Sequence, residues 1–177
     1  MNELQMAIAQ DTNGLVASQL LETATMQEGM LIKSRFGEVP LTLDKPLTVS
    51  KGLLGFAGMT QFCLLEFPVK KFQRFQLLQS LEDESLSFIV MPLSFVNPII
   101  ERDDLSGAIK ELGIGEQNAS LQLIVSVHRS EQIVRLSVNA RAPLVIDMSE
   151  RQASQYVFPS NKYKIQHFIS AETNDKV

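Results

Sequence analysis

The side chains that bind transition metals most readily are scarce in this chain of 177 residues, which holds only His128, His167 and Cys63. A zinc site needs three or four nitrogen, sulfur or oxygen ligands in close, near-tetrahedral geometry. These three side chains form no motif with such spacing, so we expect neither a metal site nor a cofactor. The thiol lies in the apolar run Phe62-Cys63-Leu64-Leu65, which is typical of a buried, unreactive core cysteine.

Adjacent carboxylates at Glu82 and Asp83 come nearest to a general acid–base pair. Neighbouring residues on a strand or turn point to different sides, so the two groups are poorly placed to act on one substrate atom. Gly52 and Gly55 are not followed by the Gly-Lys-Ser sequence of a phosphate-binding loop, and the Gly-x-Ser-x-Gly motif of a nucleophile elbow is absent. The sequence therefore predicts a protein that binds other proteins and is not an enzyme.

Charge is distributed unevenly along the chain, whose formal net charge is −4. Residues 80–116 hold eight acidic side chains against Arg102 and Lys110, and the flanking stretches hold an excess of bases. Nothing resembles the basic stripe of a nucleic-acid-binding protein, and no apolar run approaches the ~20 residues of a membrane helix. The acidic middle is either a contact for a basic protein partner or a solvated surface, and the sequence leaves both readings open.

Short strands and turns dominate residues 30–170. The alternating apolar residues of 121–128 and 134–138, joined by a polar turn, predict a β-hairpin. We expect further strands within residues 30–32, 36–39, 62–67, 75–80, 86–91, 144–146, 156–158 and 163–169. This pattern predicts a mainly β domain, an antiparallel barrel or sandwich with one or two short helices.

One helix is expected to interrupt the strands at residues 104–112. Asp103 or Asp104 can cap its first turn, because a carboxylate there accepts hydrogen bonds from free backbone N–H groups. Leu105, Ile109 and Leu112 would form its buried stripe. Gly113 is the residue expected to end it.

Residues 1–29 differ from the rest in charge and in hydrophobic pattern, and they are expected to form a flexible, partly helical arm. Val16, Leu20 and Ala24 recur at helical spacing, and the segment contains four acidic residues and no Lys or Arg. The lack of positive charge argues against a secretory or mitochondrial targeting signal, so we expect a cytoplasmic protein. The arm either packs on this domain or a neighbouring copy, or is a disordered tail; residues 171–177 are expected to be disordered.

Four short motifs occur in the order and spacing found in the FliW family of flagellar assembly factors. They are Phe36-Gly37-Glu38, Lys51-Gly52-Leu53-Leu54-Gly55-Phe56, Leu78-Gln79-Ser80-Leu81-Glu82-Asp83 and residues 139–147, Asn-Ala-Arg-Ala-Pro-Leu-Val-Ile-Asp. Gln155, Tyr163 and His167 extend the likeness, which covers residues 30–168. The sequence departs from the family at Ser50, where a proline is usual, and in having residues 1–29.

This resemblance implies a regulator with two alternative partners, flagellin and CsrA, a small RNA-binding repressor of flagellin mRNA translation. A FliW-like protein that is occupied by flagellin leaves CsrA free to repress. Once flagellin has been exported, the released protein sequesters CsrA and relieves the repression. A binding module of the same fold with changed partners remains the alternative.

We expect the partner contacts within these motifs, the acidic middle and the C-terminal segment. The candidate residues are Phe36, Leu54, Phe56, Gln79, Glu82, Asp83, Asp103, Asp104, Asn139, Pro143 and Tyr163. Apolar side chains in a loop either fill the core or meet a partner, and we expect Phe56 to do the first and Leu54 the second. The acidic candidates are expected near CsrA, whose RNA-binding surface would be basic.

Overall fold

Short strands make up most of the computed structural model, which describes residues 31–34, 36–40, 46–69, 72–93, 99–130 and 133–170. The expected arm at residues 1–29 and tail at residues 171–177 lie outside this part of the chain. The elements are β1 (Leu31–Ser34), β2 (Gly37–Pro40), β3 (Leu47–Thr48), β4 (Gln61–Glu66), β5 (Gln76–Ser80), β6 (Ser87–Pro92), α3 (Arg102–Glu111), η3 (Glu116–Asn118), β7 (Ala119–Arg129), β8 (Val134–Val138), β9 (Leu144–Asp147), β10 (Gln152–Gln155) and β11 (His167–Ile169).

Seven strands close into a barrel in the order β7-β6-β5-β4-β3-β10-β9, and β9 pairs again with β7. Neighbouring strands are antiparallel, as predicted, with one exception: β3 and β10 pair in parallel. Closure leaves the ring without a free edge that could pair with another chain.

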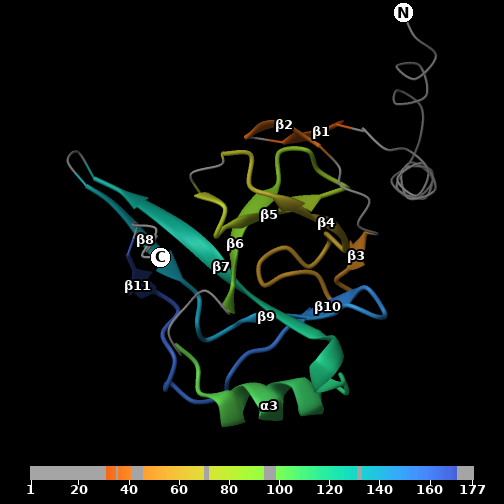
Figure 1. Cartoon of the computed structure of the whole chain (residues 1–177), viewed down its shortest axis with the longest axis vertical. Helices are drawn as coiled ribbons and strands as arrows, with labels where there is room; N and C mark the ends of the chain where they lie inside the picture. Colours follow the sequence, from red (N-terminus) through yellow and green to blue (C-terminus); the bar gives the residue numbers. More distant parts are fainter. Residues whose placement is uncertain are drawn as a thin grey trace, which may run out of the picture.

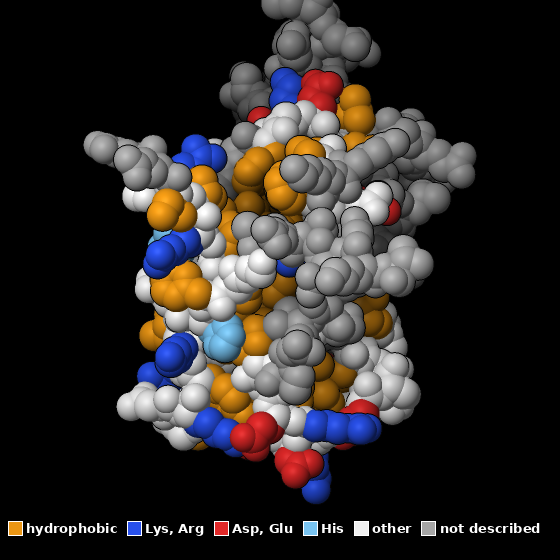
Figure 2. Space-filling model, turned by 60° about the vertical axis from the view of Figure 1, so that its left-hand side comes forward, with side chains coloured by type: hydrophobic (Ala, Val, Ile, Leu, Met, Phe, Trp, Pro, Cys, Tyr) orange, Lys and Arg blue, Asp and Glu red, His pale blue; other side chains and the backbone are white. Residues whose placement is uncertain are grey.

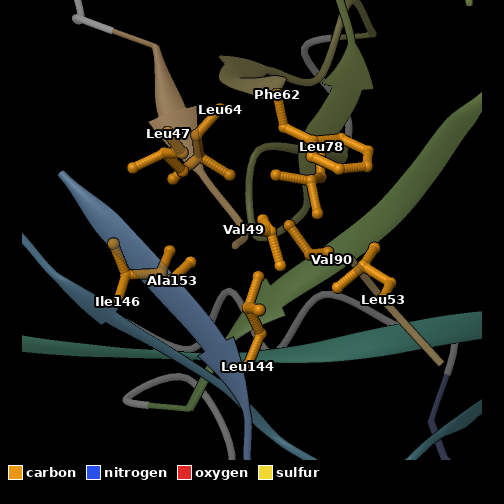
Figure 3. Packing of buried hydrophobic residues seen from close by; sticks show 10 residues of the cluster. All are labelled: Leu47, Val49, Leu53, Phe62, Leu64, Leu78, Val90, Leu144, Ile146 and Ala153. Atoms are coloured by element: carbon orange, nitrogen blue, oxygen red, sulfur yellow. The ribbon is translucent and has the colours of Figure 1, made fainter. Parts of the chain in front are cut away.

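The barrel interior is filled by ten buried hydrophobic residues that point toward one another (Figure 3). They are Leu47, Val49, Leu53, Phe62, Leu64, Leu78, Val90, Leu144, Ile146 and Ala153. Nine of them lie on barrel strands or directly beside one, whereas Leu53 comes from the loop between β3 and β4. That loop therefore contributes to the core as well as to the surface.

Strand β7 is longer than the barrel requires, and its outer half leaves the ring. There it pairs with β8, and β11 pairs with the other edge of β8. This confirms the hairpin predicted for residues 121–138, which projects to the left in Figure 1. We call the outer parts of β7 and β8, together with β11, the sheet extension.

Helix α3 lies across the lower end of the molecule in Figure 1. Its buried residues are Ala108 and Ile109, and Leu105 packs half-buried against a second hydrophobic cluster that includes Phe158 and Tyr163. Gly113 has the positive φ of a helix-ending glycine, 73°, as predicted.

The predicted capping of this helix is wrong. The N-cap residue is Glu101 and makes no side-chain capping bond, and Asp103 and Asp104 lie inside the first turn. A carboxylate in the first turn still interacts favourably with the positive end of the helix dipole. The chain therefore enters the helix about two residues earlier than the acidic pair suggested.

One predicted strand is also wrong. Residues 156–158 are not a strand; the strand in this region is β10, Gln152–Gln155, whose only buried residue is Ala153. The aromatic side chains of Tyr156 and Phe158 pack against each other outside the sheet, with ring centroids 5.2 Å apart.

The β1–β2 hairpin packs on the opposite end of the molecule from α3 (Figure 1). Val39 joins Cys63, Leu65 and Leu77 in a third buried cluster, so the thiol is a core residue as predicted. Within the described residues, no helix has the length and hydrophobicity needed to cross a membrane.

Candidate functional site

The loop between β3 and β4, residues 49–60, is hydrogen-bonded to side chains from distant parts of the sequence, Glu82 and Gln155. We call it the glycine loop. Gly52 and Gly55 have positive φ values of 65° and 85°, as predicted. A Cβ atom at Gly52 would lie 2.4 Å from the carbonyl oxygen of Phe56, so the loop folds back on itself where only glycine fits. Three consecutive turns follow: the N–H groups of Gly52, Phe56 and Met59 donate to the carbonyls of Val49, Leu53 and Phe56.

A glutamine from the C-terminal half fixes the middle of this loop. The backbone N–H of Leu54 donates to Oε1 of Gln155 at 2.9 Å, and Nε2 of Gln155 donates to the carbonyl of Ala142 at 3.1 Å. One side chain thus ties the glycine loop to the motif at residues 139–147. Gln155 was not among the predicted site residues. The only sequence feature that could have identified it is that it matches the family to which the sequence is similar.

A carboxylate from the third motif fixes the end of the loop. Oε2 of Glu82 accepts the backbone N–H groups of Thr60 at 2.6 Å and Gln61 at 3.1 Å, and Oε1 accepts the Thr60 hydroxyl at 3.2 Å. Glu82 therefore has a clear positioning role, although it is exposed and was predicted as a partner contact.

Gln79, in β5 just before the turn that carries Glu82, is fully buried. Its Nε2 lies within hydrogen-bonding distance of the carbonyls of Ser80 and Leu86, at 2.9 and 3.1 Å, and its Oε1 accepts the Ser87 hydroxyl. The hydroxyl of Ser80 accepts the N–H groups of Glu82 and Asp83, both at 3.1 Å. The β5–β6 turn is thus built around buried polar groups that find partners within it.

Two apolar side chains on the glycine loop remain open to solvent. Leu54 is 61% exposed and Phe56 is 40% exposed; the Phe56 ring stands edge-on to Phe88 with centroids 5.1 Å apart. The expectation that Phe56 fills the core is therefore wrong: Leu53 is the residue of this loop that is buried in the barrel, and Phe56 lies partly at the surface. We call Leu54 and Phe56 the loop patch.

A second group of predicted residues lies on and beside α3. Nζ of Lys162 lies 2.7 Å from carboxylate oxygens of both Glu101 and Asp104. The Tyr163 hydroxyl donates to Asp104 and accepts the Glu101 N–H at 3.1 Å. This cluster joins the N-terminal turn of α3 to the segment before β11, and Asp103 is exposed beside it.

These contacts, together with burial, shift the pKa values of three members of the cluster. The hydrogen bond from Lys162, followed by that from Tyr163, lowers the pKa of Asp104. The bond to Asp104 raises the pKa of Lys162, and burial is the larger cause that raises the pKa of Tyr163. All three shifts favour the charge states that hold α3 in place at neutral pH.

The remaining candidates differ widely in exposure. Phe36, in the β1–β2 turn, is 36% exposed, and its ring is tilted against that of Phe67 with centroids 5.6 Å apart. Pro143 is buried and its carbonyl accepts the Tyr156 N–H. Oδ1 of Asn139 accepts the Ala142 N–H at 3.0 Å, and Oδ1 of Asp83 accepts the Ser85 hydroxyl and N–H. The Ser85 bonds lower the pKa of Asp83.

The structure thus brings Leu54, Phe56 and Glu82 together around one loop and places Asp103, Asp104 and Tyr163 at a different element. Among the described residues, no group of three or more His, Cys, Asp or Glu side chains is arranged to hold a metal ion. The glycine loop presents two exposed hydrophobic side chains, Leu54 and Phe56, on a tightly held backbone. Such an arrangement suits protein recognition.

Comparison with known proteins gives one consistent result. A family model described as FliW protein matches residues 30–169. The chain is 28% identical over 144 residues to the flagellar assembly factor FliW of Alkaliphilus metalliredigens, which covers 81% of this chain and 88% of the relative. It is 29% identical over 141 residues to the factor of the same name from Thermosipho africanus, covering 80% of this chain and 96% of the relative.

A solved structure supports the same relationship. The crystal structure of the flagellar assembly factor FliW superposes with a TM-score of 0.60 at 26% sequence identity, over 78% of this chain and 96% of the solved one. The residues that match the family model, 30–169, contain the barrel, the glycine loop and α3.

Proposed function

This chain belongs to the FliW family, and from that premise we propose that it is a flagellar assembly regulator that binds flagellin and, when free of flagellin, sequesters a CsrA-type translational repressor. The names of its relatives support the role in flagellar assembly. The two partners follow from the sequence resemblance. The observation that carries a protein-binding function is the loop patch.

The loop patch has the physical properties of a recognition site. Leu54 would expose most of its side chain to water in the unbound protein, yet its backbone is fixed by Gln155 and by a glycine that tolerates no side chain. A preorganised apolar residue loses little conformational freedom when a partner covers it, so more of the hydrophobic gain appears as affinity. Hydrophobic anchors of this kind commonly dominate binding energy.

The acidic candidates complete the proposal. Asp103 is exposed at the start of α3, and Asp83 lies in the β5–β6 turn next to Glu82. We place the contact of a basic CsrA-type protein near these carboxylates, where opposite charge would speed association and weaken with salt over a Debye length of ~8–10 Å. Binding of flagellin and of CsrA would be mutually exclusive states of one protein.

Titration with purified flagellin and purified CsrA, separately and in competition, tests this function. We expect binding to each, and displacement of CsrA by flagellin. Leu54→Arg should weaken binding to at least one partner by ten-fold or more, roughly the effect of losing one buried hydrophobic anchor. Val69→Arg, which charges another exposed apolar residue on the β4–β5 connection, is the matched control and should bind normally.

Two results would count against the proposal. Failure to bind either partner would leave the FliW fold with different partners. Normal affinity of Leu54→Arg for both partners, with an unchanged melting temperature, would show that the loop patch is not a contact.

A further inference from the structure

The outer half of β7 leaves one of its two edges open. The pairing of β7 with β6 ends at Val125 and Ile89, whereas β7 itself continues to Arg129. Over residues 126–129 it pairs with β8 alone, so no described strand lies along the opposite edge. In Figure 1 this half of β7 projects beyond β6 as part of the sheet extension. We call this side of residues 126–129 the open β7 edge.

The hydrogen-bond pattern identifies the backbone groups that face the open β7 edge. The N–H of Asn139 donates to the carbonyl of Ile124, which lies opposite it in the β7–β8 register. In an antiparallel pair the direction of the backbone groups alternates from one residue to the next. The N–H and C=O groups of Val127 and Arg129 therefore point away from β8, toward the open edge. Backbone groups exposed in this way are the template on which a further strand can add.

Side chains hold this part of β7 in place. On one face, Nε2 of His128 lies 2.7 Å from the hydroxyl of Ser137, and the His128 ring lies 5.4 Å from that of Phe168, centroid to centroid. On the other face, Val127 is 41% exposed and Arg129 is exposed. A strand edge that is already ordered loses little conformational freedom when a partner strand pairs with it.

The charge of the sheet extension restricts the kind of strand that fits. Strands β7, β8 and β11 contain Arg129 and Arg135 and no Asp or Glu. Between residues 119 and 138 the sequence has one carboxylate, Glu131, which lies outside the described residues. Figure 2 shows hydrophobic and basic side chains next to one another along its left edge, with acidic side chains at the upper and lower ends of the view. Because Arg135 pairs with His128, the two arginines lie on opposite faces of the sheet.

A second copy of this chain fits the open β7 edge poorly. The twofold pairing that uses all the exposed backbone groups sets Val127 of each copy opposite Arg129 of the other. The two Arg129 side chains would then be diagonal neighbours about 7–8 Å apart, and no described residue of these strands supplies a carboxylate between them. Like charges on a strand edge are one of the ways in which proteins avoid pairing with themselves.

We propose that the open β7 edge binds an extended, acidic segment of a partner protein, which adds to the sheet as an antiparallel strand. The segment carries Asp or Glu opposite Arg129 and a β-branched residue opposite Val127. A second carboxylate between these two lies on the face of Arg135. The backbone pairing supplies affinity and the two arginines select for acidic sequences. This surface is separate from the loop patch and does not depend on the partners proposed above.

Hydrogen exchange of the free, full-length protein tests whether the edge is open. We expect the amides of Val127 and Arg129 to exchange at least about ten-fold faster than that of His128, which is directed toward β8. Equal rates for the three amides would overturn the proposal, because the edge would then be either covered within the chain or not formed. Protection of Val127 and Arg129 that rises with protein concentration would overturn it in favour of a second copy.

A synthetic peptide tests the partner chemistry. Acetyl-Thr-Ile-Glu-Glu-Val-Thr-amide carries the expected pattern, and the amide NMR signals of the isotope-labelled full chain are followed during its titration. We expect saturable shifts centred on Val127 and Arg129, with little change at Leu54. The peptide with lysine in place of both glutamates should bind at least about five-fold more weakly. The absence of saturable binding, equal binding of the two peptides or shifts centred on the loop patch would each overturn the proposal.

Methylation of the peptide backbone tests strand addition directly. A methyl group on the valine nitrogen, whose N–H would face β7, should weaken binding about two- to ten-fold, the effect of one net hydrogen bond. A methyl group on the nitrogen of the second glutamate, whose N–H would face away from β7, is the matched control and should have the smaller effect. Equal effects of the two methyl groups would contradict strand addition.

Charge reversal in the protein provides an independent test. Arg129→Glu should weaken binding of the unmodified peptide about two- to five-fold, the range for one exposed ion pair. Lys51→Glu, which reverses an exposed base on the glycine loop, is the control and should bind normally. The melting temperatures of both variants check that they are folded. Equal effects of the two substitutions would contradict binding at the open β7 edge.

Discussion

At the scale of the single residue, Gly52 shows how a loop can be held in place for recognition. Its φ is 65°, and a side chain there would collide with the backbone of Phe56 and Ala57. The loop patch depends on this close approach because Leu53 turns inward and Leu54 outward within the same tight turn.

Substitutions at the three glycines of this loop should therefore rank in severity. Gly52→Ala should lower the free energy of unfolding by more than the ~1–3 kcal/mol of backbone strain alone, because the steric collision adds to it. Gly55→Ala should show the strain without the collision, since its Cβ would meet open space. Gly58→Ala, which has neither a positive φ nor a close neighbour, should be near neutral. Denaturant unfolding measures all three, and an equal loss at Gly52 and Gly58 would contradict the assigned geometry.

At the scale of the secondary-structure element, α3 is held by the charged cluster of Glu101, Asp104, Lys162 and Tyr163. Asp104 is the member with two partners, Lys162 and Tyr163, and its pKa is lowered by them. A carboxyl whose folded-state pKa is depressed stabilises the protein above its unfolded-state pKa of about 3.9. That contribution is lost as pH falls through the folded-state value.

Asp104→Asn removes this dependence while it keeps the side-chain shape. At pH 7 the variant should have a lower free energy of unfolding than the parent. This difference in free energy should shrink progressively below about pH 5, as the parent's carboxylate becomes protonated. Denaturant titrations at a series of pH values measure it. Asp103→Asn, one residue away and exposed, is the control; a pH-independent difference for Asp104→Asn would show that its charge does not hold α3.

The elements differ in how far their sequences predicted them. The β7–β8 hairpin was predicted because Leu123, Val125 and Val138 alternate with residues of the other face. Strand β10 was missed because three of its four residues are polar and only Ala153 is buried, so its existence depends on pairing with β9 and β3. The helix was predicted, but its first turn was not, because the chain uses Asp104 to bind Lys162 and Tyr163 in place of capping.

The candidate site was predictable in part. Gly52 and Gly55 predicted a tight loop, and Leu54 was expected to contact a partner and therefore to be exposed. No local pattern distinguishes Leu53 from Leu54, and the choice between them is made by the tertiary fold, through Gln155 more than one hundred residues away. Glu82 was predicted as a site residue because of its charge. The structure shows that its carboxylate accepts the backbone N–H groups of Thr60 and Gln61 at the end of the glycine loop.

At the scale of the whole molecule, the ring of seven strands and the sheet extension differ in how they are supported. The ring strands are paired on both sides, whereas among the described strands β11, with three residues, pairs on one side only. Hydrogen exchange of the native protein should therefore be slowest in β4, β5 and β6 and markedly faster in β11. Equal protection of β11 and β5 would contradict this division.

The parallel pairing of β3 with β10 also bears on how the chain reaches its native state. It joins Thr48 to Gln152, and β9 reaches back to β7, so the ring cannot close until its last third has left the ribosome. Until then β3 and β7 present unpaired edges, which are the usual starting points for aggregation of nascent chains. Contacts so distant in sequence slow folding. Newly made protein would thus pass through an open-ring stage in which Leu54 still lacks its hydrogen bond to Gln155.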